Sequence, residues 1–110
     1  MAVVRFSLMQ PRPGCEQEIQ QIEDELLAWF TKQKGFIMGF RIGAMSKGGE
    51  IGRITLWNAH DDADATATQD HSIALRSRLL RLSSTHQDAL FEVKGTPLAA
   101  VQNVMEALKK

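Results

Sequence analysis

The sequence has few residues with which to form covalent or metal cross-links. It contains one cysteine, Cys15, and three histidines among 110 residues, so an internal disulfide is excluded. No Cys and His residues occur at the spacing of a zinc site. These absences are typical of a protein in a reducing compartment, and a cytoplasmic location is predicted.

The sequence also lacks an excess of either charge and long apolar runs. Lys+Arg and Asp+Glu each total 13, which gives a formal net charge of zero. Such a balance does not favour nucleic acid or an anionic membrane as a partner. No run approaches the roughly 18 apolar residues of a membrane span, and MAVVRFSLMQPRP at the N-terminus lacks the apolar segment of a signal peptide. We therefore expect neither export nor a membrane partner.

The first third of the chain predicts a strand followed by a helix. With 44% hydrophobic residues, the chain suffices for one compact domain. Residues 2–10 alternate in the manner of a strand, which Pro11 and Pro13 end. From about residue 13 to 33 the apolar residues instead recur every three or four positions, which predicts a helix with a stripe of Ile19, Ile22, Leu26 and Phe30.

The middle of the chain predicts a β-hairpin. Residues 36–42 alternate, and residues 51–57 alternate again after the polar segment SKGGE. Gly48 and Gly49 permit the positive φ angles of a tight connection. We expect two antiparallel strands, 36–43 and 50–58, joined by a turn at residues 47–49.

The remaining residues predict two helical regions and a strand. Asp61 and Asp70 are candidate N-caps, so a kinked or two-part helix is expected between residues 61 and 83. Residues 89–94 predict a short fourth strand. Thr96 followed by Pro97 is typical of a helix start, and a terminal helix is expected from there to residue 110.

The order of elements is β-α-β-β-α-β with a terminal helix, which predicts an α+β, ferredoxin-like arrangement. The alternation also predicts the faces of the sheet. The face toward the helices is expected to carry Val4, Phe6, Leu8, Phe36, Met38, Phe40, Ile54, Leu56, Phe91 and Val93. The opposite face is expected to carry Val3, Arg5, Met9, Ile37, Arg41, Arg53, Trp57, Leu90 and Glu92. Since this mixture is too apolar for a wet surface, we expect it to pack on a second copy of the chain.

Several of these segments resemble a known family. The strands GFIMGFR and GRITLWN, Trp57 at the end of the latter, and the acidic helix start after it resemble the antibiotic biosynthesis monooxygenase-like family of dimeric α+β barrel proteins. The resemblance covers residues 2–94 as a core, with residues 96–110 as an added helix of the single domain 1–110. It implies a homodimer with a pocket between sheet and helices in each subunit.

The resemblance also bears on chemistry. Some members of the family oxidise quinols or phenols with dioxygen and without metal or flavin, and others degrade haem. Haem-degrading members use an Asn on the first strand and a Trp and a His on the helix after the third strand. Here the first strand has no Asn, and Ala65 and Leu75 lie approximately where that Trp and His are expected. Haem degradation is therefore disfavoured, and no cofactor is expected.

The strongest candidate for a catalytic group is His71. A cofactor-free monooxygenase needs a base or hydrogen-bond donor that helps ionise its substrate in a dry pocket, and the chain has no Tyr. His71 shares its helical spacing with Leu75, Leu79 and Leu82, which predicts that it faces inward, where an imidazole can act as an acid or base. Ile73 and Leu80 form a rival stripe on the other side of the same helix, which predicts the opposite facing. The alternative is a structural histidine bonded to Asp70 or to the backbone.

Four residues form the predicted substrate-binding set. Trp57 and Asn58 end the third strand and are candidates for the mouth of the pocket, and Phe40 and Leu75 complete the set. The alternative for Trp57 is a role as an anchor of the core or interface.

Arginines are the other candidates considered. Arg5, Arg41 and Arg53 are possible ligands of an anionic substrate, although an ion pair of Arg5 with Glu92 is the simpler explanation. Arg76, Arg78 and Arg81 are predicted to form a solvated helix face, because their spacing does not align them.

Two functions are consistent with these patterns. The first is a cofactor-independent monooxygenase acting on a small apolar quinol or phenol. The second is a non-catalytic dimeric module that binds a small apolar aromatic ligand or serves as an interaction surface.

Overall fold

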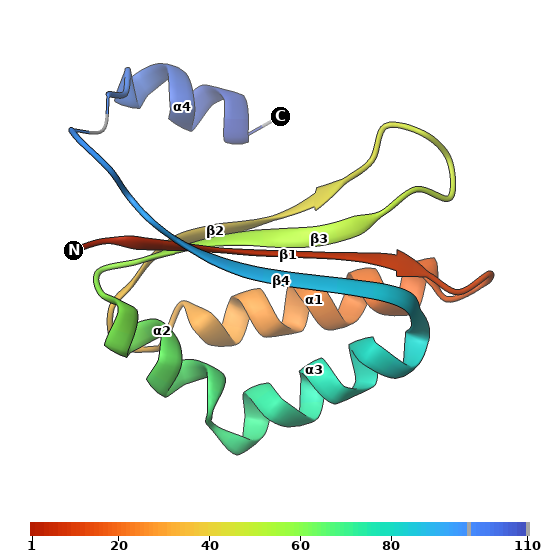
Figure 1. Cartoon of the computed structure of the whole chain (residues 1–110). Helices are drawn as coiled ribbons and strands as arrows, with labels where there is room; N and C mark the ends of the chain where they lie inside the picture. Colours follow the sequence, from red (N-terminus) through yellow and green to blue (C-terminus); the bar gives the residue numbers. More distant parts are fainter. Residues whose placement is uncertain (97, 110) are drawn as a thin grey trace.

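A computed structural model describes residues 1–96 and 98–109. Four strands form one antiparallel sheet in the order β2-β3-β1-β4, and three helices cover one face of it (Figure 1). The elements are β1 (Val3–Pro11), α1 (Glu16–Phe30), β2 (Phe36–Gly43), β3 (Ile51–Trp57), α2 (His60–Ala67), α3 (Asp70–Leu82), β4 (Ser83–Glu92) and α4 (Val101–Leu108). The ferredoxin-like prediction is confirmed.

The predicted hairpin and two-part helix are also confirmed. Gly48 has a φ of 72°, and the Gly49 N–H donates to the Ser46 carbonyl at 3.1 Å, so the turn lies where the glycines placed it. The helix is interrupted between α2 and α3 at Thr68, whose hydroxyl donates to the Asp64 carbonyl at 3.1 Å. This side-chain bond competes with the helical ladder and favours the end of α2.

Two predicted boundaries are wrong. The fourth strand begins at Ser83, directly after α3, and not at residue 89. The terminal helix begins at Val101. Thr96 therefore does not cap it, and Pro97, the other half of that predicted helix start, lies outside the described residues.

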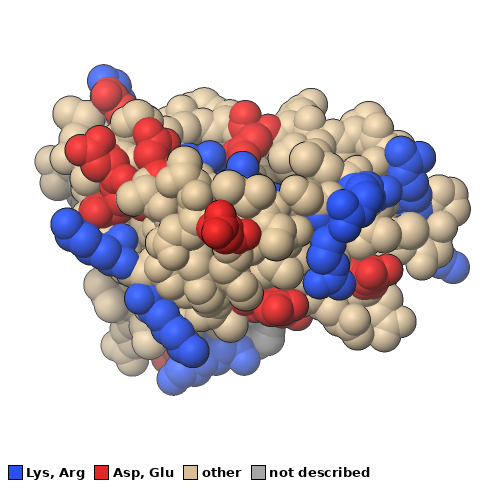
Figure 2. All heavy atoms as spheres, turned by 90° about the horizontal axis from the view of Figure 1, so that it is seen from below, with Lys and Arg blue, Asp and Glu red and all other residues tan. Residues whose placement is uncertain are grey.

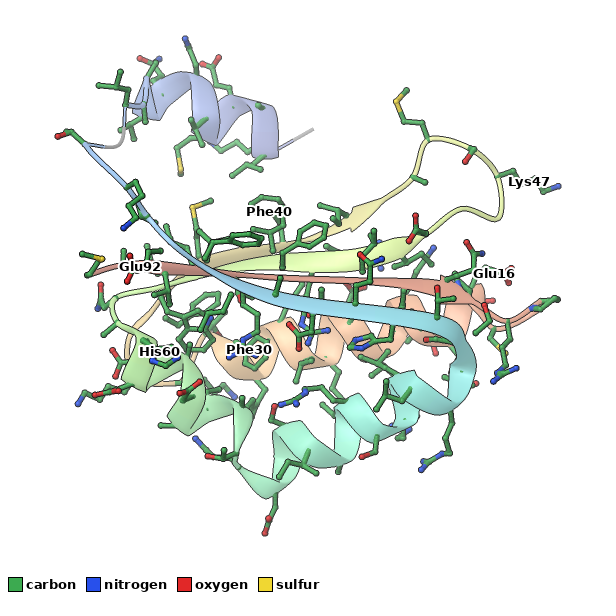
Figure 3. The ribbon with its side chains drawn as sticks, in the orientation of Figure 1. Glu16, Phe30, Phe40, Lys47, His60 and Glu92 are labelled. Atoms are coloured by element: carbon green, nitrogen blue, oxygen red, sulfur yellow. The ribbon has the colours of Figure 1, made fainter. Side chains whose placement is uncertain are left out.

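The predicted faces of the sheet are inverted except at Phe36, which lies opposite Trp57 on the helix side as predicted, before a register shift in β2. The face toward the helices buries Val3, Ser7, Met9, Ile51, Arg53, Thr55 and Trp57. The opposite face, here called the open face, carries partly exposed residues that pair across the strands: Val4, Phe6, Leu8, Met38, Phe40, Ile54, Leu56, Ala89 and Phe91. Trp57 therefore packs against helices and not against a second copy of the chain. Figure 3 shows the division, with Phe30 between sheet and helices and Phe40 on the other side.

An ion pair explains why the face with arginines turns inward. The Arg53 Nη1 lies 2.9 Å from the Glu23 Oε1 of α1, and both side chains are fully buried. Glu23 lies on the same stripe as Ile19, Leu26 and Phe30. Because a charge can be buried only when it is paired, Glu23 and Arg53 fix each other on the inner side.

The open face is accompanied by an amphipathic helix. α4 lies on that side of the sheet, away from the other helices (Figure 1), and buries none of its residues. Its apolar residues Val101, Val104, Met105 and Leu108 are exposed and, with Ala99 and Met38 of β2, line a groove of about 380 Å³. The chain thus leaves two apolar surfaces uncovered on one side.

The helix side of the molecule carries both signs of charge. Figure 2 views this side and shows basic and acidic side chains around wide uncharged areas. The pattern differs from the single basic stripe of a nucleic-acid-binding surface. Among the described residues, no helix has the length and apolar character needed to cross a membrane.

Candidate active site

The candidate site is a small cavity between the sheet and the helices α2 and α3. Its volume is about 10 Å³, room for about one water molecule. It is lined by Arg5, Phe30, Arg53, Thr55, Trp57, Ala63, Thr66, Ala67, Ser72 and Arg76. A larger hollow of about 460 Å³ lies beside the hairpin loop, with lining residues that include Ser46, Lys47 and Gly48, but it lacks a buried charged group.

Aromatic rings form one wall of the cavity. The ring of Trp57 meets Phe30 edge-on with centroids 5.5 Å apart, and meets Phe36 in the same way at 5.3 Å. The Trp57 Nε1 donates to the Thr55 Oγ1 at 3.0 Å. Because this bond and the edge-on contacts hold the indole in place, the wall is rigid.

Arg53 lines the cavity and is paired with Glu23, which is not a lining residue. Arg53 lies on β3 between Ser7 of β1 and Arg41 of β2 and is 1% exposed. Burial raises the pKa of Glu23, although the Arg53 guanidinium acts in the opposite direction. The proton affinity of this carboxylate is therefore set by two opposed effects of its surroundings.

Two further arginines lie at the edge of the cavity. The Arg5 guanidinium is 3.7 Å from the carboxylate of Asp88 and 3.6 Å from that of Asp64, which replaces the predicted pair with Glu92. The Arg76 Nη1 donates to the Ala67 carbonyl at 2.8 Å. Burial lowers the pKa of Arg76, and the nearby charge of Arg53 lowers it further, so Arg76 belongs to the cavity and not to a solvated face.

His86 lies on the same side of the sheet. Burial lowers its pKa, Asp88 opposes that shift, and Arg53 and Arg76 add to it. His86 is not among the residues that line the cavity, but it responds to the same group of charges.

Some polar atoms around the cavity lack hydrogen-bond partners. Among the described residues, the buried Arg53 Nε and Ser72 Oγ accept or donate no hydrogen bond, and the same is true of the Glu23 Oε2. Arg53 and Ser72 both line the cavity. Since unpaired buried polar groups are costly, these atoms make the cavity a candidate binding site.

The structure brings only part of the predicted site together. Trp57 lines the cavity. Leu75 is buried in the core beside it and is not a lining residue. Asn58 is exposed, with its backbone N–H bonded to the Gly35 carbonyl at 2.8 Å. Phe40 lies on the open face, opposite Ile54.

His71 does not face inward as predicted. It is exposed and its ring lies 4.8 Å from that of Trp29 at an angle of 44°. The inward stripe of α3 is instead Ser72, Leu75 and Leu79. The leucines of the predicted stripe, Leu75 and Leu79, do face inward. One turn before Leu75, however, it is Ser72 that reaches the cavity, and the neighbouring His71 points elsewhere.

Sequence reasoning considered Arg5 and Arg53 as ligands of an anionic substrate, but it missed the buried pair of Arg53 with Glu23. A signal existed for Glu23, because it lies four residues after Ile19 and three before Leu26 on the buried stripe. Arg53 likewise alternates with Ile51 and Thr55. When a helix and a strand each carry a charged residue at a position where the spacing predicts a buried apolar one, and the two charges are opposite, a buried ion pair is predicted. Among the described residues, no three His, Cys, Asp or Glu side chains form a group that could hold a metal ion.

Comparisons with known proteins place the fold. The sequence matches no protein-family model and no curated protein. The structure is similar to SnoaB from Streptomyces nogalater, described as a cofactor-independent oxygenase, with a TM-score of 0.77 and 22% identity over 86% of this chain and 95% of that one. The chain has the antibiotic biosynthesis monooxygenase fold.

Other solved structures agree. A crystal structure of an antibiotic biosynthesis monooxygenase has a TM-score of 0.76 at 12% identity, over 86% of this chain and 100% of that one. The structure of Rv0793 from Mycobacterium tuberculosis has a TM-score of 0.79 at 13% identity, over 87% and 98%. The predicted fold class, the one found in dimeric α+β barrel proteins, is therefore confirmed. Because the sequence identities are low, the comparisons establish the fold alone.

Proposed function

We propose that this protein is a cofactor-independent monooxygenase that acts on a small phenol or quinol at the cavity between the sheet and α2. The observation that carries the proposal is the aromatic wall of Trp57 and Phe30 next to the buried guanidinium of Arg53. The similarity in fold to SnoaB, an oxygenase that needs no cofactor, supports the reaction type.

The positive charges supply the first chemical step, which is ionisation of the substrate. A phenol hydroxyl placed beside Arg53 and Arg76 has its pKa lowered, because both guanidinium groups stabilise the phenolate, and its proton is released to solvent water. The electron-rich phenolate reacts with dioxygen, whereas the neutral phenol does not. Exclusion of water by the aromatic wall then protects the reactive anion.

The reaction balances without an external reductant. One phenol and one dioxygen give one quinone and one water: one oxygen atom becomes the new carbonyl, and the other leaves with the hydroxyl hydrogen and the hydrogen of the attacked carbon. The substrate supplies all four electrons that reduce dioxygen. The protein is required only to ionise the substrate, orient it and keep water away.

A ring needs more room than the cavity provides, so binding requires α2 to move away from the sheet. α2 is suited to this movement because it is eight residues long and buries only Ala63 and Thr66. Once α2 has moved, the cavity accepts the substrate oxygen, and the ring occupies the space that α2 leaves.

The same proposal includes a homodimer. The open face is an apolar surface that spans the four strands. Among the described residues, α4 lies on the same side, buries none of its side chains and presents a second apolar surface. A second copy of the chain placed face to face covers both. This replaces the interface expected around Trp57 and Ile37.

Oxygen uptake with a panel of phenols, naphthols and quinols tests the function. We expect protein-dependent uptake of one dioxygen per substrate, with one ¹⁸O atom from ¹⁸O₂ in the product and no oxygen released when catalase is added. Release of oxygen by catalase would indicate peroxide formation, and hence an oxidase. Binding without any uptake would leave the non-catalytic ligand-binding module as the function.

A further inference from the structure

The cavity contains hydrogen-bond donors that have no acceptor. Arg53 and Ser72 are 1% and 0% exposed, and both line the cavity. Among the described residues, neither the Arg53 Nε nor the Ser72 Oγ has a hydrogen-bond partner. Since an N–H of arginine can only donate, the group that satisfies it must be an acceptor.

The charge at the cavity also favours an acceptor that is negative. Arg53 is paired with Glu23 and Arg5 with Asp88. Arg76 has no ion pair among the described residues and bonds to a neutral carbonyl. Three guanidinium groups thus lie at a cavity with room for one small group, and one of them lacks a counter-charge.

The helix that carries Ser72 adds to this preference. Ser72 lies in the first turn of α3, a helix of 13 residues. The N-terminal end of a helix carries a partial positive charge and free backbone N–H groups. The unpaired Ser72 Oγ and Arg53 Nε belong to two residues that line the same cavity.

We propose that the cavity is a binding site for the oxyanion of an aromatic ligand, a carboxylate or a phenolate, held by Arg53, Ser72 and Arg76. The ring of the ligand packs beside Trp57. Binding at this site requires neither oxygen nor catalysis. The proposal rests on the proposed function only if the bound ligand is also the substrate.

Titration calorimetry with matched anionic and neutral ligands tests the site. Benzoate is compared with benzamide, and ionised 4-nitrophenol with 4-nitroanisole, so the two pairs distinguish a carboxylate from a phenolate ligand. We expect at least one anion to bind about tenfold or more tightly than its neutral partner, since hydrogen bonds to charged groups are the stronger ones.

Variants assign the binding to the named donors. Ser72→Ala and Arg76→Met should each weaken binding of the preferred anion by about tenfold or more. Arg78→Met is the control, because Arg78 lies two residues along α3 and its contact is with Glu18 at 3.7 Å. Circular dichroism checks that each variant is folded. If Arg76→Met proves unfolded, the result for Ser72→Ala, which removes only one atom, decides the test.

Three results would overturn the proposal: no binding of any probe, equal binding of an anion and its neutral partner, or anion binding that Ser72→Ala and Arg76→Met leave unchanged. The outcome is separate from that for the monooxygenase. Anion binding without oxygen uptake keeps the site and rejects the enzyme, and oxygen uptake without anion preference does the reverse.

Discussion

At the scale of single residues, the buried pair of Glu23 and Arg53 connects the fold to the site. It joins α1 to β3, and it places a guanidinium in the lining of the cavity. The same contact therefore determines which face of the sheet is inside and what chemistry that face can perform. Such a pair need not add net stability, because the cost of removing two charges from water offsets their attraction.

Removal of one partner of this pair should be far more damaging than removal of both. Glu23→Leu or Arg53→Met alone leaves an unpaired buried charged group and should lower the free energy of unfolding by about 3 kcal/mol or more. The double variant should lie within about 1 kcal/mol of the original protein. Urea unfolding of the four proteins gives the coupling energy. Additive effects of the two substitutions would contradict this explanation.

The pH dependence of stability should report on His86. Because burial lowers its pKa from 6.5, the folded protein binds fewer protons than the unfolded chain below that pH. The free energy of unfolding should then fall as the pH decreases through 6.5 toward the pKa of the folded protein.

His86→Gln should reduce this fall. Urea unfolding at about pH 7.5 and about pH 5.5 measures it for both proteins. His60→Gln is the control, since His60 is exposed and its Nε2 lies 3.2 Å from the Asp64 carboxylate. An equal loss of stability in His86→Gln and the original protein would show that His86 does not titrate as proposed.

At the scale of helices and strands, spacing between β1 and β3 limits what the sheet can tolerate. A Cβ on Gly52 would overlap the Ser7 carbonyl oxygen, whereas a Cβ on Gly43 would meet nothing within 4 Å. Neither glycine has a positive φ. The two positions therefore differ in space and not in backbone strain.

Gly52→Ala should lower the free energy of unfolding by about 2–3 kcal/mol, because the strands must separate to admit the methyl group. Gly43→Ala, the matched control, should change it by about 0.5 kcal/mol or less. Thermal unfolding of both variants makes the comparison. Similar values for the two would mean that β3 is not packed closely against β1.

The elements themselves could be predicted from the sequence, but not the side of the sheet on which they pack. Periodicity located the strands and helices because a spacing of two or of three and four is a local property. The choice of face depends on a contact between Glu23 and Arg53, 30 residues apart. Counting apolar residues favoured the wrong face, since the open face is itself apolar.

The same non-local contacts explain which site residues were missed. Trp57 was predicted because a large aromatic at a strand end is conspicuous in any arrangement. Ser72 and His71 are neighbours in the sequence, and only the packing of α3 on the sheet decides which one reaches the cavity. Arg76 was assigned to solvent because its inward direction depends on the Ala67 carbonyl of another helix.

At the scale of the whole molecule, the uncovered open face is the main unexplained surface for a monomer. It carries Phe91, which is 55% exposed, and α4 adds exposed apolar residues on the same side of the sheet. Exposed apolar surface of this extent is typical of an interface. A dimer would complete the shape that the chain alone leaves open.

Substitution of one residue on the open face should give a monomer. Phe40→Glu places a charge on the open face, and sedimentation equilibrium at micromolar concentration should change from dimer to monomer. Ile73→Glu is the control, because Ile73 is 46% exposed on α3, on the other side of the molecule. A monomeric original protein, or a Phe40→Glu variant that stays dimeric, would reject this interface.

The most direct test of the central claim, that the cavity is where substrate is ionised and oxidised, is the rate of oxygen uptake by three variants. Arg76→Met should lower the rate by about 10²-fold, because it removes a charge that stabilises the phenolate. Arg78→Met should retain it. His71→Ala separates the sequence-based hypothesis from the structure, since a catalytic His71 requires a loss of about 10²-fold and an exposed His71 requires almost none. Full activity in Arg76→Met together with a large loss in His71→Ala would contradict the account.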